Sequence, residues 1–303
     1  MAGLTRLLNK PALRDLIGSG GGLLRNLGGG GGDGPSTVEI PSLTELSYSQ
    51  TSNPGDLLGE VQGYGMKHDG TKIYVVPLTV GYVYSNALST PFDLSTMSAT
   101  EVAERNVDIA SGTDYIKAVA FSSDGLKFYT SQYATDGINQ YNLSTAYDIG
   151  SITATPDTSL LVLNQCSGFH FSSDGTKLAL CGASSVVGYT LSTAWDISTA
   201  TISGTAGSVA AQMSICDGIV VSDDGTRLWA VNEANAQAVV RQYTLSTPWQ
   251  FNTMSYDSIS LTANTAEPYC TSMWVIPGEK SLYLGYYASP GIDDCIVERY
   301  TWA

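Results

Sequence analysis

The nine residues Phe171-Ser-Ser-Asp-Gly-Thr-Lys-Leu-Ala179 place an Asp-Gly pair between short stretches rich in apolar residues. Asp-Gly in this setting is the strongest short-range signal for a β-hairpin, because glycine accepts the positive φ of a tight turn. The pattern recurs along the chain, and a repeat of this kind decides the fold. The five copies are residues 66–74, 121–129, 171–179, 221–229 and 275–283.

The repeat has a regular period and a second motif. Its turn positions Asp69, Asp124, Asp174, Asp224 and Gly278 lie 55, 50, 50 and 54 residues apart. A Leu-Ser-Thr motif with an aromatic two residues later follows each of the first four turns. Its copies are Leu88–Leu94, Leu143–Ile149, Leu191–Ile197 and Leu245–Phe251.

Each repeat predicts four short strands and no helix. In the third repeat the strands are expected at Gly168–Phe171, Lys177–Cys181, Val186–Leu191 and Ala200–Thr205. Four strands in a unit of about 50 residues are typical of a propeller blade. We therefore predict an all-β fold, a five-bladed β-propeller of four-stranded blades over residues 38–303, with six or more blades as the alternative.

The two ends of the repeat array predict how the ring closes. The fifth repeat stops at Tyr300-Thr-Trp-Ala303, which corresponds to a third strand. Residues 43–51 resemble residues 251–259, which belong to the outer strand of the fourth repeat. We therefore expect the N-terminal segment to supply the missing outer strand and to remove two open sheet edges.

Composition excludes several classes of protein. The chain has 303 residues, of which 43% are hydrophobic and 14% are charged, and its sequence pI is about 4.3. An acidic chain of this kind is not expected to bind nucleic acid, because phosphate binding depends on Lys and Arg. No apolar run approaches the roughly 18 residues of a membrane span. We therefore expect neither a nucleic-acid partner nor a membrane span.

Residues 1–37 differ from the rest and are expected to form a separate leader and linker. Positions 18–34 contain ten glycines, and residues 1–34 carry a net charge of +2, which leaves −16 for the remainder of a chain of net charge −14. The glycine-rich parts are expected to be extended, and the short apolar clusters to be partly helical at most. The run Gly28–Gly32 lacks the Lys-Ser/Thr of a phosphate loop.

Nine aliphatic residues in this leader form three clusters, each around an arginine. We expect them to anchor the chain to a partner surface, and the alternatives are an unstructured terminus and a membrane-surface helix. The anchoring residues would be Leu4, Leu7, Leu8, Leu13, Leu16, Ile17, Leu23, Leu24 and Leu27.

The repeat Phe-Ser-Ser-Asp-Gly-Thr-Lys-Leu, followed by Tyr-Thr-Leu-Ser-Thr-Ala-Trp-Asp-Ile, resembles propeller repeats of bacterial proteins and of structural proteins of tailed bacteriophages. The resemblance covers nearly all of residues 38–303. The leader is similar to the virion-anchoring tails of phage appendage and decoration proteins. The resemblance implies a structural protein with no catalytic residues.

The cysteines and the repeated aspartates, which are candidates for metal binding and catalysis, are better explained by structural roles. One repeat position near the axis favours packing along a narrow axis over a metal site, and its five residues are Val61, Ile116, Cys166, Cys216 and Cys270. The chain has five cysteines and no signal peptide, which favours reduced thiols. No cofactor or metal is expected. The recurrent Asp-Gly pairs are interpreted as turns rather than as catalytic acids. These pairs are Asp69 and Gly70, Asp124 and Gly125, Asp174 and Gly175, and Asp224 and Gly225.

Aromatic residues offer two further interpretations. Phe92, Tyr147, Trp195 and Trp249 occupy one repeated place and favour a plug between blades over a sugar-stacking platform. Less repetitive tyrosines lie in segments that link second and third strands, where a recognition surface is expected if one exists. These are Tyr133, Tyr286 and Tyr287.

From these features we expect a structural virion protein of a tailed phage that is not an enzyme. It would be made in the host cytoplasm, located in the virion, and attached to other virion proteins through residues 1–34, in multiple copies. One alternative is a propeller module that binds a host glycan or receptor. A second alternative, a propeller hydrolase, would need a metal or an acid pair in the channel.

Overall fold

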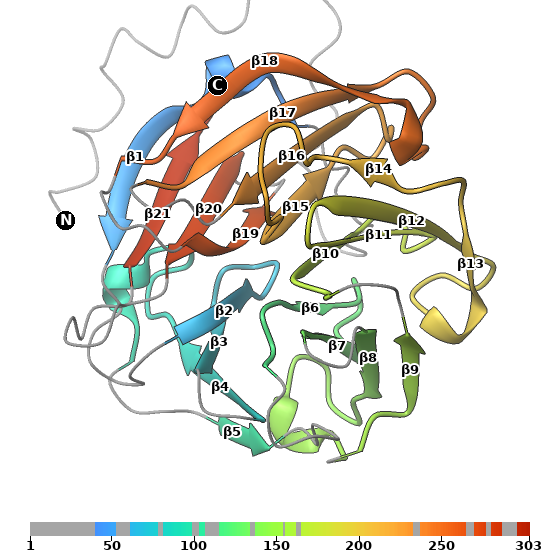
Figure 1. Ribbon diagram of the computed structural model, residues 1–303. Helices are drawn as coiled ribbons and strands as arrows, with labels where there is room; N and C mark the ends of the chain where they lie inside the picture. Colours follow the sequence, from blue (N-terminus) through green and yellow to red (C-terminus); the bar gives the residue numbers. More distant parts are fainter. Residues whose placement is uncertain are drawn as a thin grey trace, which may run out of the picture. The chain divides into compact units, whose positions relative to one another are not determined.

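The repeats form five antiparallel sheets, which are the blades of a five-bladed β-propeller in this computed structural model (Figure 1). Both the predicted blade number and the all-β class are confirmed. Among the described residues no helix is long and apolar enough to cross a membrane. The structure describes residues 40–52, 61–77, 81–98, 103–106, 115–133, 137–153, 155–161, 165–232, 237–264, 270–276, 280–286 and 296–303.

Within each of the first four blades the strands follow chain order from the propeller axis outward. The third blade also has a short strand, β14 (Gly207–Ser208), beside β12. The first blade contains β2 (Val61–Met66), β3 (Lys72–Pro77), β4 (Tyr82–Ala87) and β5 (Ala103–Asn106), and the second contains β6 (Val119–Phe121), β7 (Lys127–Gln132), β8 (Gly137–Asn142) and β9 (Thr158–Leu161). The third contains β10 (Gly168–Phe171), β11 (Lys177–Gly182), β12 (Ser185–Leu191) and β13 (Ala200–Ile202), and the fourth contains β15 (Gly218–Val221), β16 (Arg227–Asn232), β17 (Val239–Leu245) and β18 (Met254–Thr262).

The fifth blade joins the two ends of the described chain. Its strands β19 (Cys270–Ile276), β20 (Ser281–Tyr286) and β21 (Ile296–Thr301) are completed by β1 (Ser47–Ser52), which pairs antiparallel with β21. Figure 1 shows the blue strand β1 beside the red strand β21. The predicted closure by an N-terminal strand is therefore confirmed.

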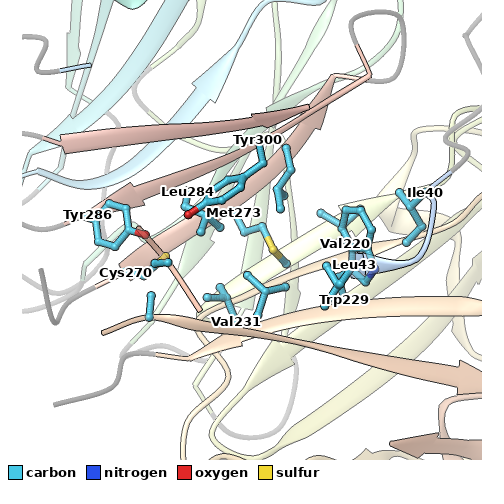
Figure 2. Packing of buried hydrophobic residues seen from close by; sticks show 14 residues of the cluster. Ile40, Leu43, Val220, Trp229, Val231, Cys270, Met273, Leu284, Tyr286 and Tyr300 are labelled. Carbon is cyan, nitrogen blue, oxygen red and sulfur yellow. The ribbon is translucent and has the colours of Figure 1, made fainter. Parts of the chain in front are cut away.

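The segment before β1 packs between the fourth and fifth blades. The short 3-10 helix η2 (Leu43–Glu45) buries Leu43, whose amide donates to Gln242 Oε1 at 2.9 Å. Arg227 Nη1 donates to the carbonyl of Ile40 at 2.7 Å. Figure 2 shows Ile40 and Leu43 in the same buried cluster as Trp229 of the fourth blade. The N-terminal segment therefore contributes to the core as well as to the sheet.

The Asp-Gly turns have the same chemistry in each of the first four blades. In the third blade Asp174 Oδ1 accepts from the Thr176 amide at 2.9 Å, and Gly175 has a φ of +70°. A Cβ atom at Gly175 would lie 2.3 Å from Trp195 Nε1. Glycine is thus required both by the turn and by the aromatic ring that lies on it.

That aromatic ring belongs to the second sequence motif, which forms a 3-10 helix in each of these blades. Asp93, Asp148 and Asp196 accept hydrogen bonds from amides at the helix starts, whereas Gln250 makes no side-chain cap. The helices are η3 (Leu94–Thr96), η4 (Ile149–Ser151), η5 (Ile197–Thr199) and η6 (Phe251–Thr253). The recurrent carboxylates therefore have structural partners.

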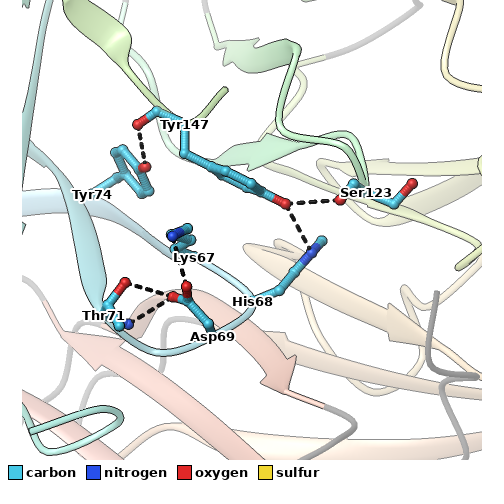
Figure 3. A network of polar contacts seen from close by, with 7 residues as sticks. All are labelled: Lys67, His68, Asp69, Thr71, Tyr74, Ser123 and Tyr147. Carbon is cyan, nitrogen blue, oxygen red and sulfur yellow. Dashed lines mark hydrogen bonds and ion pairs between the residues drawn. The ribbon is translucent and has the colours of Figure 1, made fainter. Parts of the chain in front are cut away.

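The repeated aromatic contacts the preceding blade. Figure 3 shows Tyr147 between the first and second blades, where its carbonyl accepts from the Tyr74 hydroxyl at 2.8 Å and its own hydroxyl donates to the Ser123 carbonyl at 2.9 Å. Burial raises the pKa of Tyr147 to about 12, so the ring stays a neutral hydrogen-bonding plug at physiological pH. The contacts support the plug interpretation over an open sugar platform.

Small residues bring the inner strands together around the axis. A Cβ atom at Gly168 would lie 3.0 Å from both the Asp217 carbonyl oxygen and Gly218 Cα. A Cβ atom at Gly63 would lie 2.7 Å from the carbonyl oxygen of Lys117. Adjacent inner strands therefore approach closely, and side chains just before these positions are concentrated near the axis.

Candidate functional site

Every blade carries a polar residue at one repeat position near the axis. This position directly follows the aligned residues Val61, Ile116, Cys166, Cys216 and Cys270. We call the five polar residues the axial polar ring. They are Gln62, Lys117, Ser167, Asp217 and Thr271.

The backbone is irregular at each of these positions. In the first blade Val61 pairs with Pro77 and Gly63 with Val76, so the register shifts across Gln62. In the fifth blade Cys270 pairs with Tyr286 and Ser272 with Gly285, so the register shifts across Thr271. A bulge of this kind re-aims the extra side chain and is frequent beside active sites.

The third and fourth blades show the same irregularity in a different form. The amide of Ser167 donates to the Cys181 carbonyl at 2.9 Å, although Gly168 is the residue that pairs with Cys181. The amide of Asp217 donates to the Val231 carbonyl at 3.0 Å, although Gly218 pairs with Val231. Two residues thus face one partner in both blades.

In the second blade a serine side chain holds the irregular backbone. Ser131 Oγ accepts from the amides of both Lys117, at 3.0 Å, and Ala118, at 2.8 Å. Ser131 is buried. The start of the inner strand is therefore fixed with Lys117 at the ring position.

The lysine and the aspartate of the ring form an ion pair across the axis. Lys117 Nζ lies 3.1 Å from Asp217 Oδ1, and the two side chains are 12% and 1% exposed. The residues belong to the second and fourth blades, which are separated by the third. Their side chains can meet only by reaching toward the axis, so the ring position points inward. The Lys117 ammonium also lies 4.4 Å from the centroid of the Tyr133 ring.

The other three members have buried polar atoms that make no hydrogen bond within the described part of the chain. These atoms are Gln62 Oε1, Ser167 Oγ and Thr271 Oγ1. The side chain of Ser167 is fully buried, and Thr271 is 5% exposed. The neighbouring Ser272 Oγ is also buried and without a partner, but it faces Gly285 and the Tyr64 ring. Most buried polar groups in proteins are hydrogen-bonded, so three unpartnered side chains in one ring with a buried ion pair mark an unusual position in the fold.

The other fully buried carboxylate in the described residues has a different environment. Glu298 Oε2 accepts from the hydroxyls of Tyr300, at 2.7 Å, and Tyr286, at 3.1 Å, and from the Asn264 amide at 3.2 Å. Tyr286, Tyr300 and Glu298 all belong to the fifth blade. Glu298 is satisfied as part of the blade core, which leaves Asp217 as the buried carboxylate at the axis.

The aligned cysteines lie in three separate cores rather than in one stack. Cys166, Cys216 and Cys270 are buried free thiols in three different hydrophobic clusters, and each lies near the carbonyl two residues ahead. Burial raises the pKa of Cys181, beside Cys216, well above its usual range. In the described residues no group of three metal-ligating side chains could hold a metal ion. The cysteines are thus packing residues here, and Cys295 lies outside the described residues.

The structure places the tyrosines that were expected on a recognition surface in different environments. Tyr133 is half-buried and lies against Lys117 of the axial polar ring. Tyr286 is 1% exposed, which corrects its assignment to a surface loop: it is the last residue of β20 and points into the fifth-blade core. Tyr287 and the nine aliphatic residues of the leader lie outside the described residues.

Sequence reasoning missed the ring because its five residues share no type. The sequence alignment of the repeats came within one position of the ring, because each ring residue directly follows one of the aligned residues. The sequence alone shows a polar residue at this next position in all five repeats. The pairing of Lys117 with Asp217, in contrast, depends on how the blades are arranged.

Comparison with known proteins supports the fold. No protein-family model and no curated protein matches the chain. Among solved structures, glutaminyl cyclase from Myxococcus xanthus is 11% identical with a TM-score of 0.52, and the match covers 85% of this chain and 97% of that one. A luciferin-regenerating enzyme is 14% identical with a TM-score of 0.50 and coverages of 86% and 94%.

A lactonase-like propeller also matches. The putative 6-phosphogluconolactonase from Bacteroides uniformis is 16% identical with a TM-score of 0.47, and the match covers 78% of this chain. The chain spans 66% of the length of that protein, which is slightly less than two thirds.

These comparisons overturn two expectations from the sequence. The similar propellers with TM-scores of 0.50 and 0.52 are named as enzymes, which contradicts the expected phage structural role and the expected lack of enzymatic activity. Identities of 11–16% establish the fold alone, and an activity for this chain rests on its own residues.

Proposed function

We propose that the protein is a hydrolase-like propeller enzyme whose active site is the axial polar ring. Its substrate would be a small molecule with an ester or lactone carbonyl. One observation carries the proposal: the Lys117–Asp217 ion pair lies buried at the axis beside three side chains with unpartnered polar atoms. This combination is costly for folding and typical of a functional site.

The ion pair supplies the two groups that ester hydrolysis needs. Asp217 accepts a proton from a water molecule as the water oxygen bonds to the carbonyl carbon. The Lys117 ammonium stabilises the negative charge that develops on the carbonyl oxygen. When the bond to the leaving oxygen breaks, that oxygen takes the proton held by Asp217. The products are an acid and an alcohol.

The remaining members of the ring would position the substrate. The Ser167 and Thr271 hydroxyls can donate or accept hydrogen bonds, and Gln62 Oε1 can accept one. Gln62 and Lys117 are the members with partial exposure, whereas Ser167, Asp217 and Thr271 are buried. Substrate would therefore enter on the side of Gln62 and Lys117.

Proton release in a pH-stat tests the proposal, because hydrolysis of an ester or lactone yields an acid that ionises at neutral pH. A panel of small esters and lactones would be offered to the wild-type protein and to the variant Asp217→Asn. We expect release with at least one substrate and a loss of about 100-fold or more in the variant. The matched control Asp157→Asn changes an exposed carboxylate and should retain full activity. Absence of release across the panel, or equal rates in Asp217→Asn and the wild type, would refute the proposal.

A further inference from the structure

We infer that Tyr133 is a positioning residue for Lys117, whose ammonium its ring keeps directed at Asp217. This inference rests on the proposed function, because it adds a residue to the same site. It depends on three observations: the contacts of the ammonium, the backbone hydrogen bonds that hold Tyr133 beside Lys117, and the difference between the second and third blades at the same two places.

The Lys117 ammonium contacts a carboxylate and an aromatic ring. Its Nζ lies 3.1 Å from Asp217 Oδ1 and 4.4 Å from the centroid of the Tyr133 ring. A cation within about 6 Å of an aromatic centroid is attracted to the ring, and the attraction is stronger where water is excluded. The Lys117 side chain is 12% exposed, and its long flexible stem could turn the ammonium toward water. The contact with Tyr133 opposes that turn and therefore favours the position at Asp217.

Backbone hydrogen bonds hold Tyr133 beside Lys117. Tyr133 directly follows β7, and its amide donates at 3.0 Å to the carbonyl of Tyr115, which precedes Lys117 in the chain. The Ser131 amide donates at 2.9 Å to the carbonyl of Ala118, which directly follows Lys117. The two segments are therefore joined on both sides of Lys117, so the backbone positions of the lysine and the tyrosine are fixed relative to each other.

At the two equivalent places the third blade has neither a cation nor an aromatic ring. Its member of the axial polar ring is Ser167, and the residue that directly follows β11 is Ala183. In the second blade these places hold Lys117 and Tyr133. The aromatic residue thus accompanies the cationic member of the axial polar ring, and a methyl group accompanies the neutral one. This correspondence is expected for a cation–π contact rather than for a residue that only fills the end of a strand.

Tyr133 bears on the proposed reaction through the lysine. The ammonium would stabilise the negative charge on the carbonyl oxygen, and such stabilisation requires a group that is held in place before the charge develops. Tyr133 contacts Lys117 and gives or takes no proton in the reaction. Because the charge develops only in the transition state, loss of the Tyr133 ring should lower kcat and leave KM almost unchanged.

Acylation of individual lysines tests the contact without any substrate. The full-length wild type and its variants would react with the N-hydroxysuccinimide ester of acetic acid, and peptide mass spectrometry would give the rate at Lys117. Tyr133→Leu and Tyr133→Met remove the ring, and we expect Lys117 to react at least about threefold faster in both. Tyr133→Phe keeps the ring, and its rate at Lys117 should stay within about twofold of the wild-type rate.

A second lysine in the same samples is the control. Lys177 Nζ donates to Thr190 Oγ1 at 2.9 Å in the third blade, and its acylation rate should be the same in every variant if the fold is kept. Wild-type rates at Lys117 in both ring-free variants would overturn the inference. Equal acceleration in Tyr133→Phe and Tyr133→Leu would overturn it as well, because the ring face would then have no effect.

Hydrolysis in the pH-stat supplies the second measurement. We expect Tyr133→Leu to lower kcat by about 3- to 10-fold with KM within about twofold of the wild-type value, and Tyr133→Phe to restore most of the loss. An unchanged kcat in Tyr133→Leu, or a change confined to KM, would overturn the positioning role.

The outcomes separate this inference from the proposed function. If Lys117 is acylated faster in the ring-free variants but no ester or lactone is hydrolysed, Tyr133 positions the lysine and the hydrolase proposal is wrong. If an ester is hydrolysed with dependence on Asp217 and Tyr133→Leu changes neither acylation nor kcat, the hydrolase proposal stands and the role of Tyr133 is wrong.

Discussion

Lys117 Nζ lies 3.1 Å from Asp217 Oδ1, although the two residues belong to blades that are not neighbours in the ring. The third blade lies between them, so the pair links two sides of the propeller axis. The relationship is therefore a property of the closed ring, and it brings an acid and a base to one place.

Breaking this ion pair should destabilise the protein in a predictable order. Lys117→Met leaves Asp217, whose side chain is 1% exposed, without this counter-ion and should cost about 3–5 kcal/mol. Asp217→Asn should cost less, because the 12% exposed Lys117 can turn toward water. Urea unfolding measures both free energies. Equal stabilities of both variants and the wild type would show that the pair is not energetically coupled.

The glycine of the Asp-Gly turn should not tolerate a side chain. Gly175 has a φ of +70°, and an added Cβ atom would lie 2.3 Å from Trp195 Nε1. We expect Gly175→Ala to lower the free energy of unfolding by at least about 2 kcal/mol. Gly150→Ala, where the nearest atom is 3.1 Å away on the Asp148 side chain, is the control and should cost about 1 kcal/mol or less. Similar costs for both variants in chemical denaturation would contradict this account of the turn.

Stability should fall as the pH drops below neutrality, in part because of His170. Burial lowers the pKa of His170 to about 4, against the opposing effects of Asp223 and the Val221 backbone. Between the ordinary pKa of 6.5 and about 4, the unfolded chain binds a proton that the folded chain does not. The folded state should therefore lose up to about 2 kcal/mol from His170 between about pH 7 and about pH 5.

The variant His170→Leu tests this pH dependence, since it removes the titrating ring. Its free energy of unfolding should change less over the same pH range than that of the wild type. The other histidine supplies the control: His68→Gln keeps His170 and should keep most of the slope. Identical slopes for His170→Leu and the wild type would mean that His170 does not titrate differently in the folded state.

Truncation should distinguish the leader from the closing strand. A chain that begins at residue 38 keeps η2 and β1 and is expected to unfold at the temperature of the full-length protein. A chain that begins at residue 53 loses β1 and the buried residues Ile40 and Leu43, and leaves β21 as an open edge. We expect it to be unfolded or aggregated. Circular dichroism melting of both chains measures this difference, and equal stability of the two would contradict closure by β1.

The blades were predictable because their chemistry is local and repeated. Asp174 and Gly175 form their turn with residues only a few positions away, and the same pair recurs in three other blades. Closure by β1 was predictable because residues 43–51 resemble an outer strand elsewhere in the chain. Short-range signals thus determined both the blade number and the order of the strands.

The site was not predictable in this way, because its geometry depends on contacts between distant parts of the chain. Lys117 and Asp217 are 100 residues apart and come together only when the ring closes. Tyr133 directly follows the second strand of its blade and Tyr286 ends the second strand of its own, yet Tyr133 lies against the axial lysine and Tyr286 is buried against Glu298. Which way such a side chain points depends on packing between blades, which a single sequence does not encode locally.

The most direct test of the active-site assignment is a crystal structure of Asp217→Asn with the substrate that the wild-type protein hydrolyses. Removing the base should leave the substrate intact at the axis. We predict its density within hydrogen-bonding distance of Ser167 Oγ and Thr271 Oγ1, with its carbonyl group toward Lys117. Substrate bound away from the propeller axis, or only water molecules at these atoms, would contradict the account.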